Sequence, residues 1–139
     1  MDHTRCFGLV FPDICPKCPT RLAFFQSCQG WQCPVFANIL YLLGELGAKP
    51  GTLDLVPGGI GSETRQTLEN IQATLHANGS DMSKVVKCLV MLADINEWPA
   101  MNDVYRTFFS APYPARSALG ASGLALGARV EIECMARLD

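Results

Sequence analysis

This 139-residue sequence lacks several features, and each absence excludes a class of protein. The longest apolar candidate, ANILYLLGELG, is interrupted by Gly44 and Glu45, so no stretch predicts a membrane span. The segment MDHTRCFGLVFPD holds one arginine and a short apolar patch, and we therefore expect neither a signal peptide nor a transit peptide. Lysine and arginine form no run and the formal net charge is -2, which argues against nucleic-acid binding through phosphate neutralisation.

Cysteine, in contrast, is abundant, with seven residues. The number is odd and no secretion signal is seen, so we expect free thiols in a reducing compartment rather than a disulfide framework. This predicts a cytoplasmic protein, with the nucleus and the mitochondrion left open. Two cysteines, Cys88 and Cys134, fall in apolar strand-like segments and are predicted to be buried.

Four further cysteines form a cluster at Cys15, Cys18, Cys28 and Cys33. The first two have the C-x-x-C spacing of a zinc site, but the second pair is spaced more loosely. A redox C-x-x-C is less favoured, because the surrounding PDICPKCPT is too rich in proline to begin a helix. Free thiols are the main alternative to zinc.

The chain is predicted to divide into an irregular segment, residues 1–38, and one domain, residues 39–139. Prolines interrupt any periodicity in the first part. In the second, residues 38–46 predict a strand and residues 47–62 a loop. Ser62 is the expected N-cap of a helix over residues 63–79, and Gly79 is the expected end of this helix. Within the helix, Leu68, Ile71 and Leu75 form one apolar stripe.

The rest of the domain predicts a strand, a helix and two strands. The continuous apolar run over residues 84–94 is typical of a strand covered on both faces. Asn96 is the expected cap of a helix over residues 97–109, whose first turn tolerates Pro99. Two strands, residues 115–122 and 129–138, are then joined by a turn around Gly127. This order predicts an α+β domain with helices on one face of a sheet.

The last strand alternates between two kinds of side chain. The apolar set is expected to face the helices: Val130, Ile132, Cys134 and Ala136. The charged set is expected to face away: Arg129, Glu131, Glu133 and Arg137. From periodicity alone, the charged set is either a solvated face or part of a site with Arg116.

Two motifs, Pro114-Ala115-Arg116 and Glu131-Ile132-Glu133, point to a family. With the intervening sequence from Tyr41 to Leu138, they resemble the RidA family of reactive-intermediate imine deaminases. The resemblance covers about 70% of the chain in uninterrupted order. It implies a chorismate-mutase-like fold with a mixed sheet and two helices on one face. It also implies a homotrimer with sites in the clefts between subunits.

The resemblance further implies a reaction, the hydrolysis of small 2-imino acids and their enamine tautomers to 2-keto acids and ammonia. By position, Arg116 binds the substrate carboxylate, since its planar fork matches a carboxylate bidentately. Glu131 activates the attacking water, and one carboxylate can serve as base and then as acid. Asn102, the backbone of Ala118 and Gly44 are implied to contact the substrate. No metal and no organic cofactor is implied.

Residues 1–38 and Leu43 depart from the family pattern. Its Pro-Tyr-Ser motif has no match in residues 1–38, and Leu43 replaces a serine that contacts substrate. Codon degeneracy allows Cys18 to Ala23 and Gly30 to Phe36 to encode family-like motifs in shifted reading frames. This predicts frameshifts in the gene, which the nucleotide sequence would reveal or contradict.

Three functions other than the deaminase remain open. A non-catalytic trimer could bind a small carboxylate through Arg116 as a regulator, which the missing tyrosine and serine favour and the retained Glu131 disfavours. A translation inhibitor or ribonuclease also fits the resemblance, but the acidic composition argues against direct RNA chemistry. A zinc-stapled interaction module would carry about one zinc per chain.

Overall fold

The computed structural model describes residues 35–138. The cluster Cys15, Cys18, Cys28 and Cys33 lies outside the described residues, so the zinc prediction and the domain boundary at residue 38 stay predictions. In chain order the elements are β1 (Val35–Phe36), β2 (Ile39–Leu46), α2 (Gly59–Ala77), η1 (Met82–Lys84), β3 (Val85–Leu92), η2 (Ile95–Glu97), α3 (Trp98–Tyr105), β4 (Ala115–Gly120), η3 (Ala125–Gly127) and β5 (Val130–Arg137).

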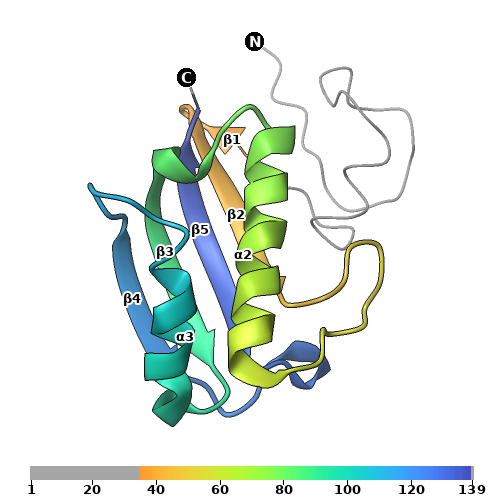
Figure 1. The fold of residues 1–139 in the computed structure, drawn as a ribbon. Helices are drawn as coiled ribbons and strands as arrows, with labels where there is room; N and C mark the ends of the chain where they lie inside the picture. Colours follow the sequence, from red (N-terminus) through yellow and green to blue (C-terminus); the bar gives the residue numbers. More distant parts are fainter. Residues whose placement is uncertain (1–34, 139) are drawn as a thin grey trace.

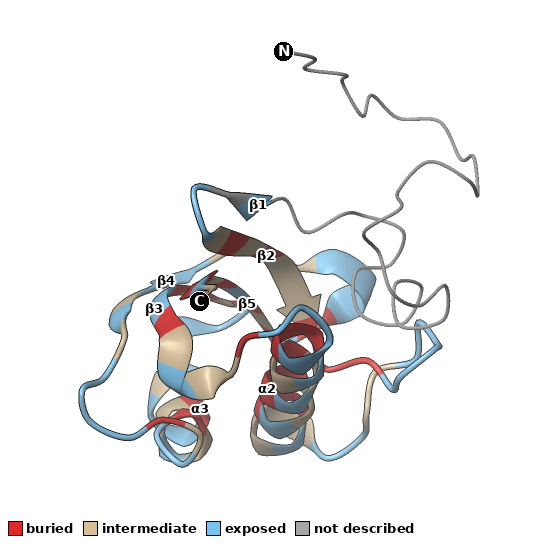
Figure 2. Cartoon of the chain, turned by 90° about the horizontal axis from the view of Figure 1, so that it is seen from above, coloured by how far each residue is buried: buried red, intermediate tan, exposed pale blue. Residues whose placement is uncertain are grey.

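The strands of the described part form one mixed sheet in the order β1-β2-β5-β3-β4. All neighbours are antiparallel except β3 and β4, which run parallel. Helices α2 and α3 lie side by side on one face of this sheet (Figures 1 and 2). The predicted α+β architecture is therefore confirmed, and β4 forms an edge although β5 follows it in the sequence. We call the helix-free side the open face, defined by Leu89, Met91, Glu131, Glu133 and Met135.

Both helices begin at other residues than the sequence predicts. Helix α2 starts at Gly59, after Gly58 with φ 111°, and no side chain caps it. A Cβ at Gly58 would lie 2.4 Å from the Ser62 Oγ, so the glycine permits the early start and Ser62 as N-cap is wrong.

Asn96 as the cap of the second helix is also wrong. Asp94 accepts a hydrogen bond from the Asn96 N–H at 2.9 Å and caps the short turn η2 instead. Helix α3 then begins at Trp98, with Pro99 in its first turn as expected. It ends at Tyr105, four residues before the predicted end.

The core lies between the helices and the sheet. The α2 stripe of Leu68, Ile71 and Leu75 is completely buried, as predicted. So is the apolar set of β5, which comprises Val130, Ile132, Cys134 and Ala136. Each such aliphatic side chain contributes roughly 1.5–3 kcal/mol through burial.

Within residues 35–138, the prediction that β3 is covered on both faces is wrong. Cys88, Val90 and Leu92 face the helices and are fully buried. On the other side, Val86 is 46% exposed and Leu89 and Met91 are only half-buried. The cause is that both helices of the described part lie on the same side of the sheet.

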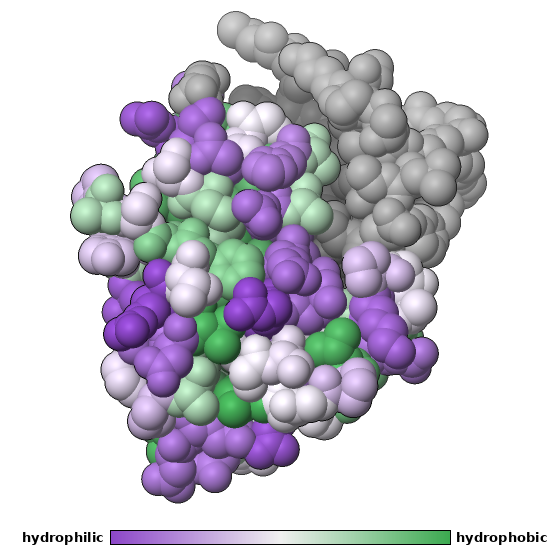
Figure 3. All heavy atoms as spheres, in the orientation of Figure 1, coloured by the Kyte–Doolittle hydropathy of each residue, from purple (hydrophilic) through white to green (hydrophobic). Residues whose placement is uncertain are grey.

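The helix layer has an outer surface of mixed polarity. Figure 3 shows hydrophilic side chains spread over this side of the molecule, with hydrophobic ones between them. Within residues 35–138, neither helix is long and apolar enough to cross a membrane.

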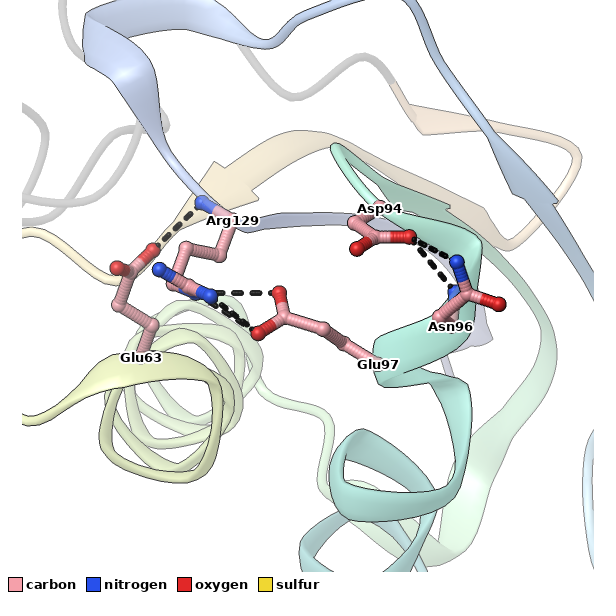
Figure 4. A network of polar contacts seen from close by, with 5 residues as sticks. All are labelled: Glu63, Asp94, Asn96, Glu97 and Arg129. Carbon is pink, nitrogen blue, oxygen red and sulfur yellow. Dashed lines mark hydrogen bonds and ion pairs between the residues drawn. The ribbon is translucent and has the colours of Figure 1, made fainter.

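A polar network joins α2, η2 and the start of β5 at one end of the sheet (Figure 4). Arg129 immediately precedes β5, and its side chain does not point away from the helices as predicted. Its Nε donates to both carboxylate oxygens of Glu97 at 3.1 Å. Its backbone N–H donates to Glu63 Oε2 at 2.8 Å. Because Glu63 is 6% exposed, its bond fixes the start of β5 against α2 away from water.

We expect Glu63→Ala to reduce the free energy of unfolding by about 1–3 kcal/mol, since it leaves the Arg129 N–H without this acceptor. Chemical denaturation followed by circular dichroism measures the change. Glu69→Ala is the matched control, because Glu69 is exposed on the same helix. Equal stabilities of the two variants would contradict a structural role for the Glu63 bond.

Candidate active site

Arg116 of β4 lies on the helix side of the sheet. Its Nη1 donates to Asn102 Oδ1 of α3 at 2.8 Å. Its Cζ lies 4.6 Å from the ring centroid of Tyr105 and 5.5 Å from that of Trp98. One hydrogen bond and two cation–π contacts therefore hold a half-buried guanidinium in a defined orientation.

Local helix geometry and strand register produce this arrangement. Trp98, Asn102 and Tyr105 are spaced by four and three residues, so they share one face of α3. Arg116 is the register partner of Cys88, whose side chain faces the helices, and partners in adjacent strands face the same side. The sequence predicted Arg116 and Asn102 as site residues but not Trp98 or Tyr105. Their helical spacing to Asn102 was the signal that could have indicated them.

Ala118 shares the helix-side face with Arg116, two residues along β4. The Ala121 N–H donates to the Leu92 carbonyl of β3 at 2.7 Å. Because a strand's backbone groups alternate in direction, the N–H and C=O of Arg116 and Ala118 then point away from β3. No strand of the described part pairs with this edge, so the Ala118 backbone offers a donor and an acceptor beside Arg116.

Glu131 and Gly44 meet on the open face. A Cβ placed on Gly44 would lie 1.9 Å from Glu131 Oε1, so the carboxylate occupies the space that a side chain would fill. Glu131 is half-buried. Burial, and to a lesser extent the charge of Glu133, raise the pKa of Glu131 above its usual value. A carboxyl with a raised pKa is better matched to proton transfer near neutral pH.

The structure does not bring Arg116 and Glu131 together within one chain. Glu131 is the partner of Met91, and Met91 is the partner of Leu119, three residues along β4 from Arg116. Two strand spacings and three residue rises separate their Cα atoms by about 14 Å. Their side chains also lie on opposite faces of the sheet. One chain therefore carries two separate candidate half-sites, Arg116 with Asn102 and Glu131 with Gly44.

Other chemistry-bearing residues do not form a site. Among residues 35–138, no group of three His, Cys, Asp or Glu side chains is placed to hold a metal ion. His76 is exposed near the end of α2, as expected from its position in the sequence. His3 lies outside the described residues.

Comparison with known proteins identifies the family. The model of the family "Endoribonuclease L-PSP" matches residues 31–138. This chain belongs to the endoribonuclease L-PSP family, also called the RidA family. The goat protein named 2-iminobutanoate/2-iminopropanoate deaminase is 47% identical over 97 residues, which are 70% of this chain and 71% of that protein.

Solved structures of RidA-family proteins agree with this assignment. RidA from the Antarctic bacterium Psychrobacter sp. PAMC 21119 is 35% identical and superposes with a TM-score of 0.72 over 76% of this chain and 85% of that one. TdcF from E. coli, solved with bound serine, is 28% identical with a TM-score of 0.71, over 76% of this chain and 85% of that one.

Proposed function

We propose that this chain hydrolyses small 2-imino acids and their enamine tautomers to 2-keto acids and ammonia. Arg116 binds the substrate carboxylate, and Glu131 activates the attacking water. The observation that carries the proposal is the pair of half-sites, an oriented guanidinium and a carboxyl with a raised pKa. The curated deaminase relatives support the reaction class.

The chemistry needs both half-sites. An imine carbon is electrophilic, and water must lose a proton as it attacks. Ammonia must then gain a proton as it leaves, so a single carboxyl can act first as base and then as acid. Arg116 supplies the orientation, because two parallel hydrogen bonds to a carboxylate fix its plane as well as its position. Bound serine in TdcF fits the same requirement, since serine also carries a carboxylate.

The complete site is proposed to form between two copies of the chain in a homotrimer. The opposite placement of Arg116 and Glu131 supports this, since one chain cannot present both to one small molecule. The open face also carries half-buried apolar side chains, Leu89, Met91 and Met135, next to the two glutamates. A neighbouring copy on this face would bury them and bring its own Arg116 toward Glu131.

The remaining site residues take supporting roles in this proposal. Asn102 holds the guanidinium through its Oδ1. The Ala118 backbone, at the open edge of β4, lies on the path of the leaving nitrogen. Gly44 leaves room for the Glu131 carboxylate.

A second function, binding a small carboxylate without turnover, is favoured by one residue. Leu43 stands where the family pattern has a serine, so a polar substrate contact is replaced by an apolar side chain. Such a protein would bind a keto acid or an imino acid through Arg116 and release no product.

A coupled assay separates the two functions. An amino-acid oxidase or a dehydratase generates the imine in situ, and the formation of the keto acid is followed with and without the purified protein. We expect the wild-type chain to accelerate keto-acid formation. A folded protein that binds the carboxylate but gives no acceleration would favour the regulatory function.

We expect Glu133→Gln to move the acidic limb of the kcat/KM profile to lower pH. Glu131 must be ionised to take a proton from water, and the Glu133 charge contributes to its raised pKa. Removing that charge lowers the pKa of Glu131, so its base form persists in more acidic solution. The control is Glu69→Gln, which removes the same charge from the exposed side of α2. If both variants keep the wild-type profile, Glu131 is not the titrating base.

A further inference from the structure

Two buried cysteines face each other across neighbouring strands. Cys88 of β3 and Cys134 of β5 are direct register partners, and their Sγ atoms are 2.7 Å apart. Cys88 is 0% exposed and Cys134 is 2% exposed. Neither has a role in the proposed deamination, so the contact between their thiols is unexplained by that function.

The backbone pairing at this position permits a covalent bond. The Ala93 N–H donates to the Arg129 carbonyl at 3.0 Å, which marks a hydrogen-bonded pair of the β3–β5 ladder. Hydrogen-bonded and non-hydrogen-bonded pairs alternate along an antiparallel ladder, so Cys88 and Cys134 form a non-hydrogen-bonded pair. In such pairs the Cα atoms are about 4.5 Å apart, which lies within the range that disulfides span.

We propose that Cys88 and Cys134 form an oxidisable dithiol that closes to a cross-strand disulfide and thereby changes the Arg116 half-site. Hydrogen peroxide is the oxidant. The Cys88 thiolate attacks a peroxide oxygen, the O–O bond breaks and a sulfenic acid forms. The departing hydroxide takes up the proton that the Cys88 thiol released and leaves as water. The Cys134 sulfur then attacks the Cys88 sulfur, the S–O bond breaks and a second water leaves with the thiol proton. A dithiol reductant reverses the reaction.

The local electrostatics assign Cys88 as the attacking thiol. The hydrogen bond with Cys134 lowers the pKa of Cys88, although burial opposes it, and the Tyr105 hydroxyl and then the charge of Arg116 lower it further. The same contact, together with burial, raises the pKa of Cys134. One thiol of the pair is therefore favoured as thiolate, and the other remains protonated to resolve the sulfenic acid.

Tyr105 connects this pair to Arg116. Its ring lies 4.6 Å from the Arg116 Cζ, and its hydroxyl is buried next to Cys88. Burial, and then the nearby Cys88 sulfur, raise the pKa of Tyr105, which places that hydroxyl beside the dithiol. Closing the disulfide draws the Cys88 sulfur toward Cys134, so the contact between Cys88 and Tyr105 changes.

Peptide mapping tests the disulfide directly. The purified full chain is treated with hydrogen peroxide, alkylated in denaturant and digested with trypsin. Cleavage after Lys87, Arg106, Arg129 and Arg137 isolates each cysteine, in peptides 88–106 and 130–137. We expect these two peptides to be recovered linked, and to separate after dithiothreitol treatment. Recovery of both as separately alkylated peptides, while other cysteines of the chain oxidise, would overturn the proposal.

Steady-state kinetics test whether the disulfide changes the Arg116 half-site. This part of the proposal rests on the proposed deaminase function. We expect oxidation to raise KM by roughly threefold or more with a smaller change in kcat, because Arg116 binds the carboxylate in ground and transition states alike. Cys134→Ala and Cys134→Ser should keep the low KM after peroxide treatment. An unchanged KM in protein that carries the linked peptide would overturn the coupling. If the reduced protein is inactive, the deaminase proposal fails, while the linked peptide still decides whether the dithiol closes.

Discussion

Arg116→Ala is expected to reduce kcat/KM for keto-acid formation by about 10²–10³-fold, because it removes a charge-assisted pair of hydrogen bonds to the substrate. Arg116→Lys should restore little of this loss, since an ammonium lacks the planar fork that meets both carboxylate oxygens. The imine-coupled assay measures both variants. Arg106→Ala is the matched control, because Arg106 is an exposed arginine just after α3. Near wild-type activity in Arg116→Ala would remove the arginine from the site.

A mixing experiment tests where the complete site forms. Arg116→Ala and Glu131→Gln are each expected to be inactive alone, since every site of either protein lacks one group. When the two are unfolded together and refolded as mixed trimers, a site with Arg116 from one chain and Glu131 from its neighbour is regained. Random mixing at equal amounts restores about a quarter of the sites in a cyclic oligomer. No recovery in well-folded mixed oligomers of two inactive variants would show that the site does not combine Arg116 and Glu131 from neighbouring chains.

The parts of the fold that follow from local periodicity were predictable. The apolar stripe of α2 at Leu68, Ile71 and Leu75 and the alternation of β5 both depend only on 3.6- and 2-residue repeats. Helix boundaries were not, because they depend on backbone conformation. The positive φ of Gly58 lets α2 begin before Ser62. Asn96 lies inside the short turn η2, which Asp94 caps, and therefore does not cap the helix that follows.

The apolar run over residues 84–94 predicted the strand β3 correctly, but not how its two faces are covered. Its side chains suit a strand with two covered faces, but within residues 35–138 only the helix side is covered. Leu89 and Met91 remain half-buried on the open face. The amino-acid sequence indicates which faces of a strand are apolar, but it does not indicate whether the same chain or another copy would cover them.

For the candidate site, the sequence predicted which residues belong to it but not where they lie relative to one another. The motif resemblance selected Arg116 and Glu131 individually, but which side of the sheet each faces depends on register with β3 and on the parallel pairing of β4. Register is a long-range property, and a shift of one residue would reverse the direction of every side chain. The contact between Gly44 and Glu131 is equally non-local, since 87 positions separate the two residues in sequence.

Gly44→Ala is expected to lower kcat by about 10²-fold with little change in KM, because misplacing a catalytic group by about 1 Å has an effect of this size. The new Cβ would lie 1.9 Å from Glu131 Oε1 and 2.7 Å from its Cδ, so the carboxylate must move. Arg116, on the other face, keeps its contacts and continues to bind the substrate carboxylate. Steady-state kinetics in the coupled assay measures kcat and KM separately.

Two comparisons show whether Gly44→Ala acts through Glu131. Gly61→Ala adds the same methyl group where the nearest atom, Val104 Cγ2, is 3.9 Å away, so its kcat should stay near wild type. The double variant Gly44→Ala with Glu131→Gln should be no slower than Glu131→Gln alone, since a displaced carboxylate and a missing one disable the same step. Because Glu131 is a flexible side chain, its displacement should leave the thermal unfolding midpoint nearly unchanged. Fully multiplicative losses in the double variant would mean that Gly44 contributes to catalysis independently of Glu131.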